Sequence, residues 1–176
     1  MYLATPDKLV PHILYFEGGM AGNVDGMICT NSGVTLATFR SYFGRNKNCN
    51  DLRNMTREQW MHIFKTGFWD KWQADSIKSQ SIANLLVDWL WGSGVYGIKY
   101  PQQVLGVKAD GIVGPKTLAA INNYPDQKEL FQKLWNRRKK HFEDIAKSPS
   151  KKKFLKGWLR RNDNLKWIDD DINQEV

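Results

Sequence analysis

Glu17, Asp25 and Thr30 have side chains that could cleave a glycosidic bond if the loop after Glu17 folds back over it. Glu17 ends an apolar stretch and precedes two glycines, Asp25 follows eight residues later, and Thr30 follows five residues after that. An acid on an apolar helix face is partly desolvated, which favours its protonated form, and such a group can act as a general acid toward a glycosidic oxygen. Asp25 would stabilise positive charge on the sugar or orient a water molecule, and Thr30 would hold that water. These three are therefore the candidate catalytic residues.

A purely structural role would also explain this pattern. Gly18 and Gly19 can end a helix that has Glu17 in its last turn. The same glycines remove side-chain bulk where a polymer would approach. The spacing of the two acids and the threonine does not choose between these interpretations.

Helix signals predominate in the segments that must position these residues. Thr5 as a cap and Pro6 in the first turn predict a helix start, and apolar residues at helical spacing continue this helix to Glu17. Alternating strand patterns are absent except for a brief hairpin within residues 20–34, so the sequence predicts a mainly α fold with a small β-hairpin near the candidate site. Two further helices are predicted with their end signals: residues 35–44, with Thr35 as cap and Gly44 as stop, and residues 56–69, with a capping box of Thr56 and Gln59. Two short helices are predicted on either side of the turn at Asp110-Gly111, and the second has Pro115 at its first position. The remaining predicted helices cover residues 80–94, about 126–147 and 154–159.

The composition is that of a globular protein. The 176 residues are 41% hydrophobic and 25% charged, enough for one well-filled core. No run of about 18 apolar residues occurs, so we expect no transmembrane segment. The N-terminal residues do not combine a basic with an apolar segment, so we expect synthesis in the cytoplasm without a Sec-type signal peptide.

Cysteine and histidine give no sign of a metal site. Cys29 and Cys49 stand alone without CxxC spacing, and the three histidines are scattered. We therefore expect buried or half-buried free thiols, no metal and no cofactor.

The positive charge is concentrated in one region. The net charge is +8, and residues 133–161 contain 12 basic residues against Glu143 and Asp144. A basic patch suits a polyanion such as a cell-wall polymer, a membrane surface or nucleic acid, whereas the simpler interpretation is the solvated faces of two helices.

Two segments resemble known families. The Glu17-Gly18-Gly19 motif and the later stretch "TNSGVTLATFR" resemble the N-terminal signature of glycoside hydrolase family 108, the N-acetylmuramidase-type lysozymes. The stretch "QQVLGVKADGIVGPKTLAAIN" resembles the predicted peptidoglycan-binding domain that accompanies them, and "FLKGWLRRNDNL" is similar to the family's C-terminal helix. There are two departures: the usual Asp-Pro-Gly-Gly-like loop reads Val24-Asp25-Gly26-Met27, and Trp91 stands where the family has asparagine.

The resemblance implies a lysozyme-like helical fold. It implies a catalytic region over residues 5–92 and a peptidoglycan-binding helical region over residues 93–173, which we expect to pack as one globule. The functional glutamate of the family corresponds to Glu17. Candidate substrate-binding residues are Thr35, Trp69, Trp91 and Asp110.

The implied activity is that of a peptidoglycan hydrolase, cleaving the β-1,4 bond between N-acetylmuramic acid and N-acetylglucosamine. The expected partners are peptidoglycan and anionic cell-wall polymers, with no nucleic acid, and the expected place of action is the periplasm or the extracellular wall, reached through a holin or a secretion apparatus. A non-catalytic cell-wall-binding protein, or a structural protein of a phage or secretion system, is the main alternative. A helical nucleic-acid-binding protein is a third, supported only by charge.

Overall fold

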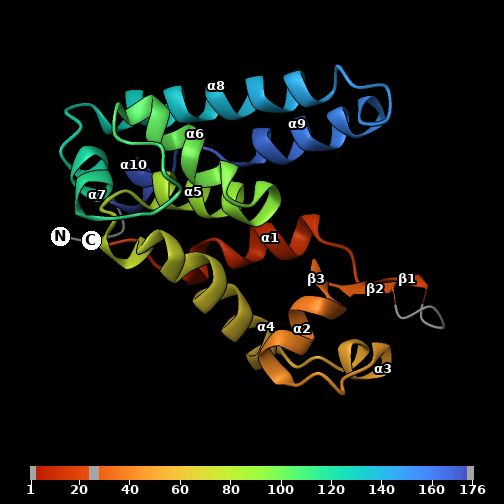
Figure 1. The fold of residues 1–176 in the computed structure, drawn as a ribbon. Coiled ribbons are helices and arrows are strands. Elements are labelled where there is room, and N and C mark those ends of the chain that lie inside the picture. The colour runs from red at the N-terminus through yellow and green to blue at the C-terminus, as the bar shows by residue number, and fades with distance from the viewer. Residues whose placement is uncertain (1–2, 24–27, 174–176) are drawn as a thin grey trace. The chain divides into compact units, whose positions relative to one another are not determined.

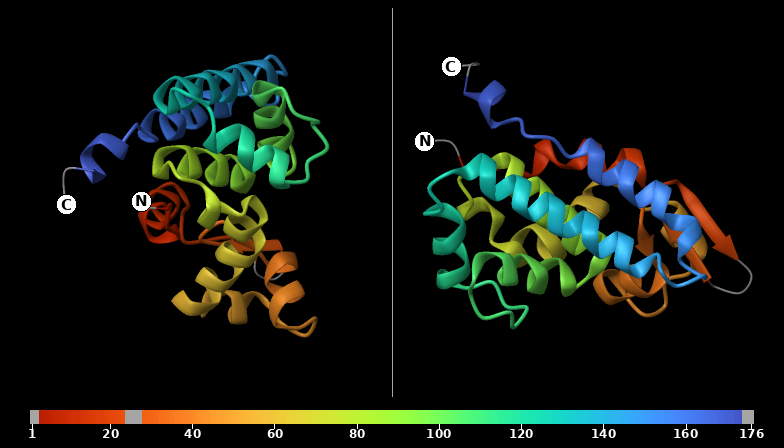
Figure 2. Two further views of the ribbon diagram at one scale, coloured as in Figure 1. Left: turned by 90° about the vertical axis from the view of Figure 1, so that its left-hand side faces the viewer. Right: turned by 90° about the horizontal axis from the view of Figure 1, so that it is seen from above.

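The computed structural model describes residues 3–23 and 28–173, and the chain divides into two compact units. We call residues 10–68 the hairpin unit, and residues 1–9 together with 69–176 the helical unit. The predicted mainly α class is confirmed, because helices make up most of both units (Figures 1 and 2). None of the described helices is long and apolar enough to cross a membrane.

The hairpin unit contains the candidate catalytic residues. Its elements are α1 (Val10–Phe16), β1 (Met20–Asn23), β2 (Ile28–Asn31), β3 (Val34–Thr35), α2 (Leu36–Phe43), α3 (Cys49–Arg53), α4 (Arg57–Phe64) and the start of η2 (Lys65–Trp69). The strands form an antiparallel sheet in the order β1-β2-β3, in which Gly22 pairs with Cys29 and Thr30 with Thr35. The hairpin predicted within residues 20–34 is therefore confirmed, with a short third strand added.

The helical unit is built around α5. Its elements are η1 (Pro6–Lys8), η3 (Asp70–Trp72), η4 (Ala74–Ser76), α5 (Gln80–Ser93), α6 (Tyr96–Leu105), α7 (Pro115–Asn122), α8 (Gln127–Ile145), η5 (Lys152–Phe154), α9 (Leu155–Asn164) and α10 (Asp169–Ile172). Every residue from 80 to 90 is buried, and α5 packs against both α6 and α8. Gly97 allows the close approach of α6, because a Cβ atom there would collide with the backbone of Trp89 and Leu90.

Two of the three predicted helix caps, those at Thr35 and Thr56, are present in the structure. The Thr35 hydroxyl accepts a hydrogen bond from the N–H of Thr38 at 3.1 Å, and Thr56 forms the predicted capping box with Gln59. Asp126 caps α8, accepting from the N–H of Glu129 at 2.9 Å. The predicted caps at Thr35 and Thr56 are confirmed because each needs only residues within one helical turn.

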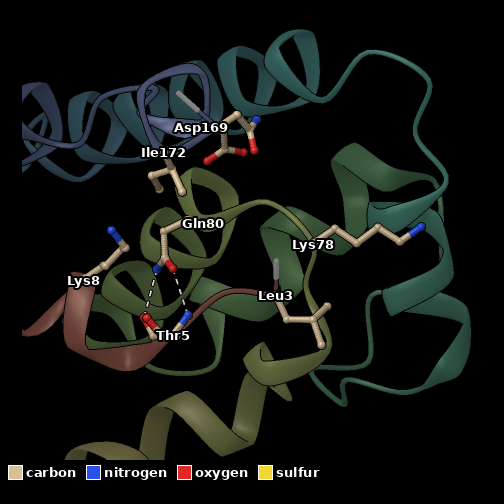
Figure 3. Close-up of a pocket in the computed structure, with 8 residues that line it drawn as sticks. Leu3, Thr5, Lys8, Lys78, Gln80, Asp169 and Ile172 are labelled. Carbon is tan, nitrogen blue, oxygen red and sulfur yellow. Dashed lines mark hydrogen bonds between the residues drawn. The ribbon is translucent and has the colours of Figure 1, made fainter. Parts of the chain in front are cut away.

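The predicted continuous helix from Pro6 to Glu17, with Thr5 as its cap, is wrong. The segment forms the short η1 and then a separate α1, and the Thr5 side chain makes no cap. Pro11 has no N–H to continue a helix from η1. The Thr5 backbone instead bonds to the Gln80 side chain: its N–H donates to Oε1 at 2.8 Å and its carbonyl accepts from Nε2 at 3.0 Å (Figure 3).

The same region includes a small pocket of about 130 Å³ at the start of α5. Asp169 of α10 lies there (Figure 3), and its Oδ1 accepts from the N–H and the hydroxyl of Ser81 at 2.9 and 2.7 Å. The carboxylate thus satisfies a donor at the N-terminus of α5 and attaches the C-terminal segment to it.

A buried ion-pair cluster joins α5, α8 and α9. The Asp88 side chain has no exposed surface, and its Oδ2 lies 2.9 Å from Nη1 of Arg138, which is also buried. Its Oδ1 lies 2.7 Å from Nη2 of Arg161. Burial lowers the pKa of Arg138, and the Asp88 carboxylate opposes that shift. Asp88 interrupts the apolar sequence of α5 because it is the counter-charge of these two arginines.

We predict that Asp88→Asn strongly destabilises the protein. The variant leaves the Arg138 guanidinium buried without its counter-charge, a change that typically costs about 3–5 kcal/mol. Urea denaturation followed by far-UV circular dichroism measures the free energy of unfolding. Asp163→Asn, which changes an exposed acid on α9, is the control and should stay within about 0.5 kcal/mol of the parent. Equal effects of the two substitutions would show that the ion-pair cluster adds nothing to stability.

The expectation of free thiols is wrong, because Cys29 and Cys49 form a disulfide. Both residues are buried, and the bond connects β2 to α3. Asn31 reinforces the connection, because its Nδ2 donates to the carbonyl of Leu52 in α3 at 2.9 Å. The sequence lacked a signal for this pairing because the cysteines approach only after the hairpin and α3 have packed together.

Replacing both cysteines with serine should destabilise the hairpin unit. The disulfide closes a loop with a sequence separation of 20, and a loop of similar size contributes about 3 kcal/mol. Denaturation of the oxidised parent and of the Cys29→Ser/Cys49→Ser variant measures this difference. Thiol titration of the oxidised parent, unfolded without reductant, is the matched control: no thiol should react, and two reactive thiols would refute the disulfide.

Candidate active site

Glu17 lies where α1 gives way to the β-hairpin. Its N–H donates to the carbonyl of Ile13 at 2.9 Å, so its backbone completes the last turn of the helix. Because Val10, Ile13 and Glu17 are spaced by one helical turn, they lie on one face of α1. Val10 and Ile13 are buried, while Glu17 is half-buried. The predicted placement of this acid at the polar end of an apolar helix face is therefore present in the structure.

The two glycines after Glu17 are not required by the backbone. Gly18 and Gly19 have no positive φ, so they do not form the left-handed cap that commonly ends a helix. A Cβ atom at either position would meet nothing within 4 Å. Neither strain nor crowding among the described residues explains these glycines, and a side chain added at either position would extend into open space.

Thr30 and Thr35 are neighbours in the sheet. They are directly paired across β2 and β3, so their side chains lie on the same face. The Thr35 hydroxyl accepts from the N–H of Thr38 and donates to the Thr38 hydroxyl at 3.0 Å. Thr35 thus has a structural task as a helix cap, and its contact with substrate stays a prediction, as does the role of Thr30 in holding water.

Asp25 lies outside the described residues. Strand β1 ends before it, at Asn23, and strand β2 begins after it, at Ile28. Its catalytic role stays a prediction from the sequence.

Trp69, Trp91 and Asp110 belong to the helical unit. Trp69 has no exposed surface, and its Nε1 donates to Oδ1 of Asp75 at 2.7 Å. A wholly buried ring offers no face to a sugar, so the structure supports a packing role for Trp69. Trp91 is half-buried near the end of α5, and its contact with substrate stays a prediction.

Asp110 takes part in a hydrogen-bonded turn that is organised by Gln102. The buried Gln102 side chain donates to Asp110 Oδ1 at 3.2 Å and to the Ile112 carbonyl at 3.0 Å, and its Oε1 accepts from the N–H of Gly111 at 2.9 Å. The N–H of Ile112 donates to Asp110 and is the main cause of its lowered pKa. The Asp110-Gly111 motif thus shapes a turn, and Gln102, which was not among the predicted site residues, holds it together.

Comparison with known proteins agrees with the resemblance seen in the sequence. Residues 10–94 match the family described as glycosyl hydrolase 108, and residues 96–163 match the family described as predicted peptidoglycan domain. A solved structure, that of Brucella abortus SagA, is 27% identical and has a TM-score of 0.76, with 90% of each chain covered. No curated protein matches the chain.

The boundary between the two family matches lies near residue 95. The boundary between the two compact units lies earlier, because the main segment of the helical unit begins at Trp69. The boundary between residues 92 and 93, and the packing of both regions as one globule, stay predictions. The two matches together account for nearly the whole chain: it consists of a glycosyl hydrolase 108 domain followed by a predicted peptidoglycan domain.

Proposed function

We propose that the protein is an N-acetylmuramidase that cleaves the β-1,4 bond between N-acetylmuramic acid and N-acetylglucosamine, with Glu17 as general acid. The two domains imply a glycosidase that acts on peptidoglycan. The observation that carries the finer proposal is the half-buried Glu17 beside two glycines that neither backbone strain nor crowding requires. Space at this point would let a polymer reach the carboxyl group.

The reaction begins with transfer of the Glu17 proton to the glycosidic oxygen. As the bond from this oxygen to C1 of the muramic acid breaks, the bonding electrons leave with the N-acetylglucosamine and positive charge develops on the muramyl ring. A water molecule then adds to C1 and gives up one proton to a carboxylate of the site or to solvent, which leaves a hydroxyl group at C1. Glu17 is protonated again, from that carboxylate or from solvent, before the next turnover. Asp25 would stabilise the positive charge or orient this water, and Thr30 would hold the water.

Glu17→Gln should lower the rate of wall clearing by about 10²–10⁴-fold, because glutamine keeps the shape of the side chain but cannot deliver a proton. The measurement is the loss of turbidity of purified cell walls, with a melting curve for each variant. Glu58→Gln, which changes an exposed acid in the first turn of α4, is the matched control and should clear walls at the parental rate.

Three results would speak against this assignment. Clearing by Glu17→Gln at the parental rate would leave Glu17 a structural residue. Equal losses in Glu17→Gln and Glu58→Gln would show a general effect of removing negative charge. If the parent protein binds walls but does not clear them, the result would support the alternative of a non-catalytic wall-binding protein.

The basic region supports attraction to anionic wall polymers, but it is smaller than the sequence suggested. Arg138 and Arg161 pair with Asp88 and are not available to a polyanion. Lys151, Lys152 and Lys153 remain exposed around η5. Exposed charges attract an anionic wall without a shaped site, and salt screens that attraction.

Replacing Lys151, Lys152 and Lys153 together with glutamine should weaken wall binding most at low salt. Pelleting with purified walls at several salt concentrations measures the bound fraction. Lys71→Gln/Lys78→Gln, which removes two exposed lysines outside this region, serves as the control for net charge. If the triple variant binds like the parent at low salt, these lysines only solvate a turn.

We also propose that the protein works outside the cytoplasm, in the periplasm or at the extracellular wall. The Cys29–Cys49 disulfide supports this location, because such bonds persist in oxidising compartments. Export through a holin or a secretion apparatus stays a prediction from the sequence.

A further inference from the structure

The helical unit has a second groove that none of the predicted site residues lines. Its volume is about 480 Å³, within the range of about 300–1,000 Å³ that is typical of ligand pockets. It lies between the end of α5, the first turns of α6 and the C-terminal half of α8. Gly92 and Ser93 keep the α5 side free of bulky side chains.

An aromatic stack forms one wall of this groove. The Tyr96 and Tyr100 rings are stacked, with their centroids 5.4 Å apart and an interplanar angle of 24°. The Arg137 guanidinium carbon lies 3.9 Å from the centroid of Tyr100. Tyr100 is thereby held in place, while Tyr96 is 52% exposed at the end of the stack. Tyr96 therefore presents a supported aromatic face to solvent.

The polar groups of the groove include both donors and acceptors. Hydrogen bonds from Lys140 and Lys147 lower the pKa of Asp144 to about 2, so Asp144 is an ionised acceptor at neutral pH. Burial, followed by the charges of Arg137 and Arg138, lowers the pKa of His141, so its imidazole is neutral at neutral pH and can both donate and accept. Arg137 supplies donors only.

This combination fits a sugar better than it fits a polyanion. A pyranose ring has a flat apolar face that can lie on an aromatic ring, and hydroxyl and acetamido groups at its edge that donate and accept hydrogen bonds. A phosphate-rich ligand offers no donor to the Asp144 carboxylate, whereas sugar hydroxyl groups can donate to it.

We propose that this groove is a second glycan-binding site, which holds an N-acetylated amino sugar of a peptidoglycan strand. The pyranose lies on Tyr96, Arg137 donates to an acetamido or carboxyl oxygen, and Asp144 accepts from a hydroxyl group. The inference rests on the proposed substrate, not on the catalytic role of Glu17. It assigns a place in the predicted peptidoglycan domain where the glycan would bind.

The test is a titration of the full chain carrying Glu17→Gln with tetra-N-acetylchitotetraose. Backbone amide resonances of Gly92 and Ser93, followed by two-dimensional NMR, report on the groove and should shift. Tyr96→Ala in this background should raise the dissociation constant obtained from these resonances about tenfold. This is the size expected for loss of one well-packed aromatic contact. Tyr96→Phe keeps the aromatic face and should bind like the parent.

Phe154→Ala is the matched control, because Phe154 is an aromatic residue of similar exposure (45%) that does not line the groove. It should leave the dissociation constant unchanged. If Tyr96→Ala does not fold, Arg137→Gln tests the same groove and should weaken binding as well. The proposal is overturned if the Gly92 and Ser93 resonances do not move, or if Tyr96→Ala and Phe154→Ala bind alike.

This outcome is separable from that of the catalytic proposal. If the Gly92 and Ser93 resonances do not shift while Glu17→Gln loses wall clearing, the second glycan site alone is overturned. Binding in the groove together with parental clearing by Glu17→Gln would overturn the catalytic assignment alone.

Discussion

Burial of the Asp88 carboxylate is the constraint on which the helical unit depends. A buried carboxylate is tolerated only when it is paired, and Asp88 is paired by Arg138 and by Arg161, which lies 73 residues away. This requirement brings α8 and α9 to the same point of α5. It thereby also positions α8 beside α6, where the aromatic and polar groups of the second groove converge.

The hairpin unit depends on a different constraint, the attachment of a very small sheet to its helices. A three-stranded sheet with strands of two to four residues buries little apolar surface by itself. The Cys29–Cys49 bond and the Asn31 hydrogen bond attach β2 to α3, and the Trp60 indole donates to the Ser32 carbonyl at 3.0 Å. These contacts hold the sheet that follows Glu17 against α3 and α4, and Gly18 and Gly19 add no side chain to the segment between α1 and β1.

Sequence reasoning succeeded where a signal is local and was wrong where it depends on distant partners. The caps at Thr35 and Thr56 and the hairpin were predictable because short segments specify them. Thr5 was misread because Gln80, far along the chain, binds its backbone. The disulfide was missed because its cysteines meet only through packing, and two arginines assigned to the basic patch are held by Asp88. At the candidate site, the place of Glu17 at the end of a helix was predictable, whereas the burial of Trp69 and the organising role of Gln102 arise from tertiary contacts.

The most direct measurement of the central claim is mass spectrometry of the soluble products released from purified peptidoglycan by the parent protein. A muramidase that uses Glu17 to protonate the glycosidic oxygen and adds water at C1 must leave N-acetylmuramic acid at the reducing end of each fragment. We predict these ends, with the peptide stems intact. Reducing N-acetylglucosamine ends, anhydro-muramyl ends or cleaved peptides would contradict the account.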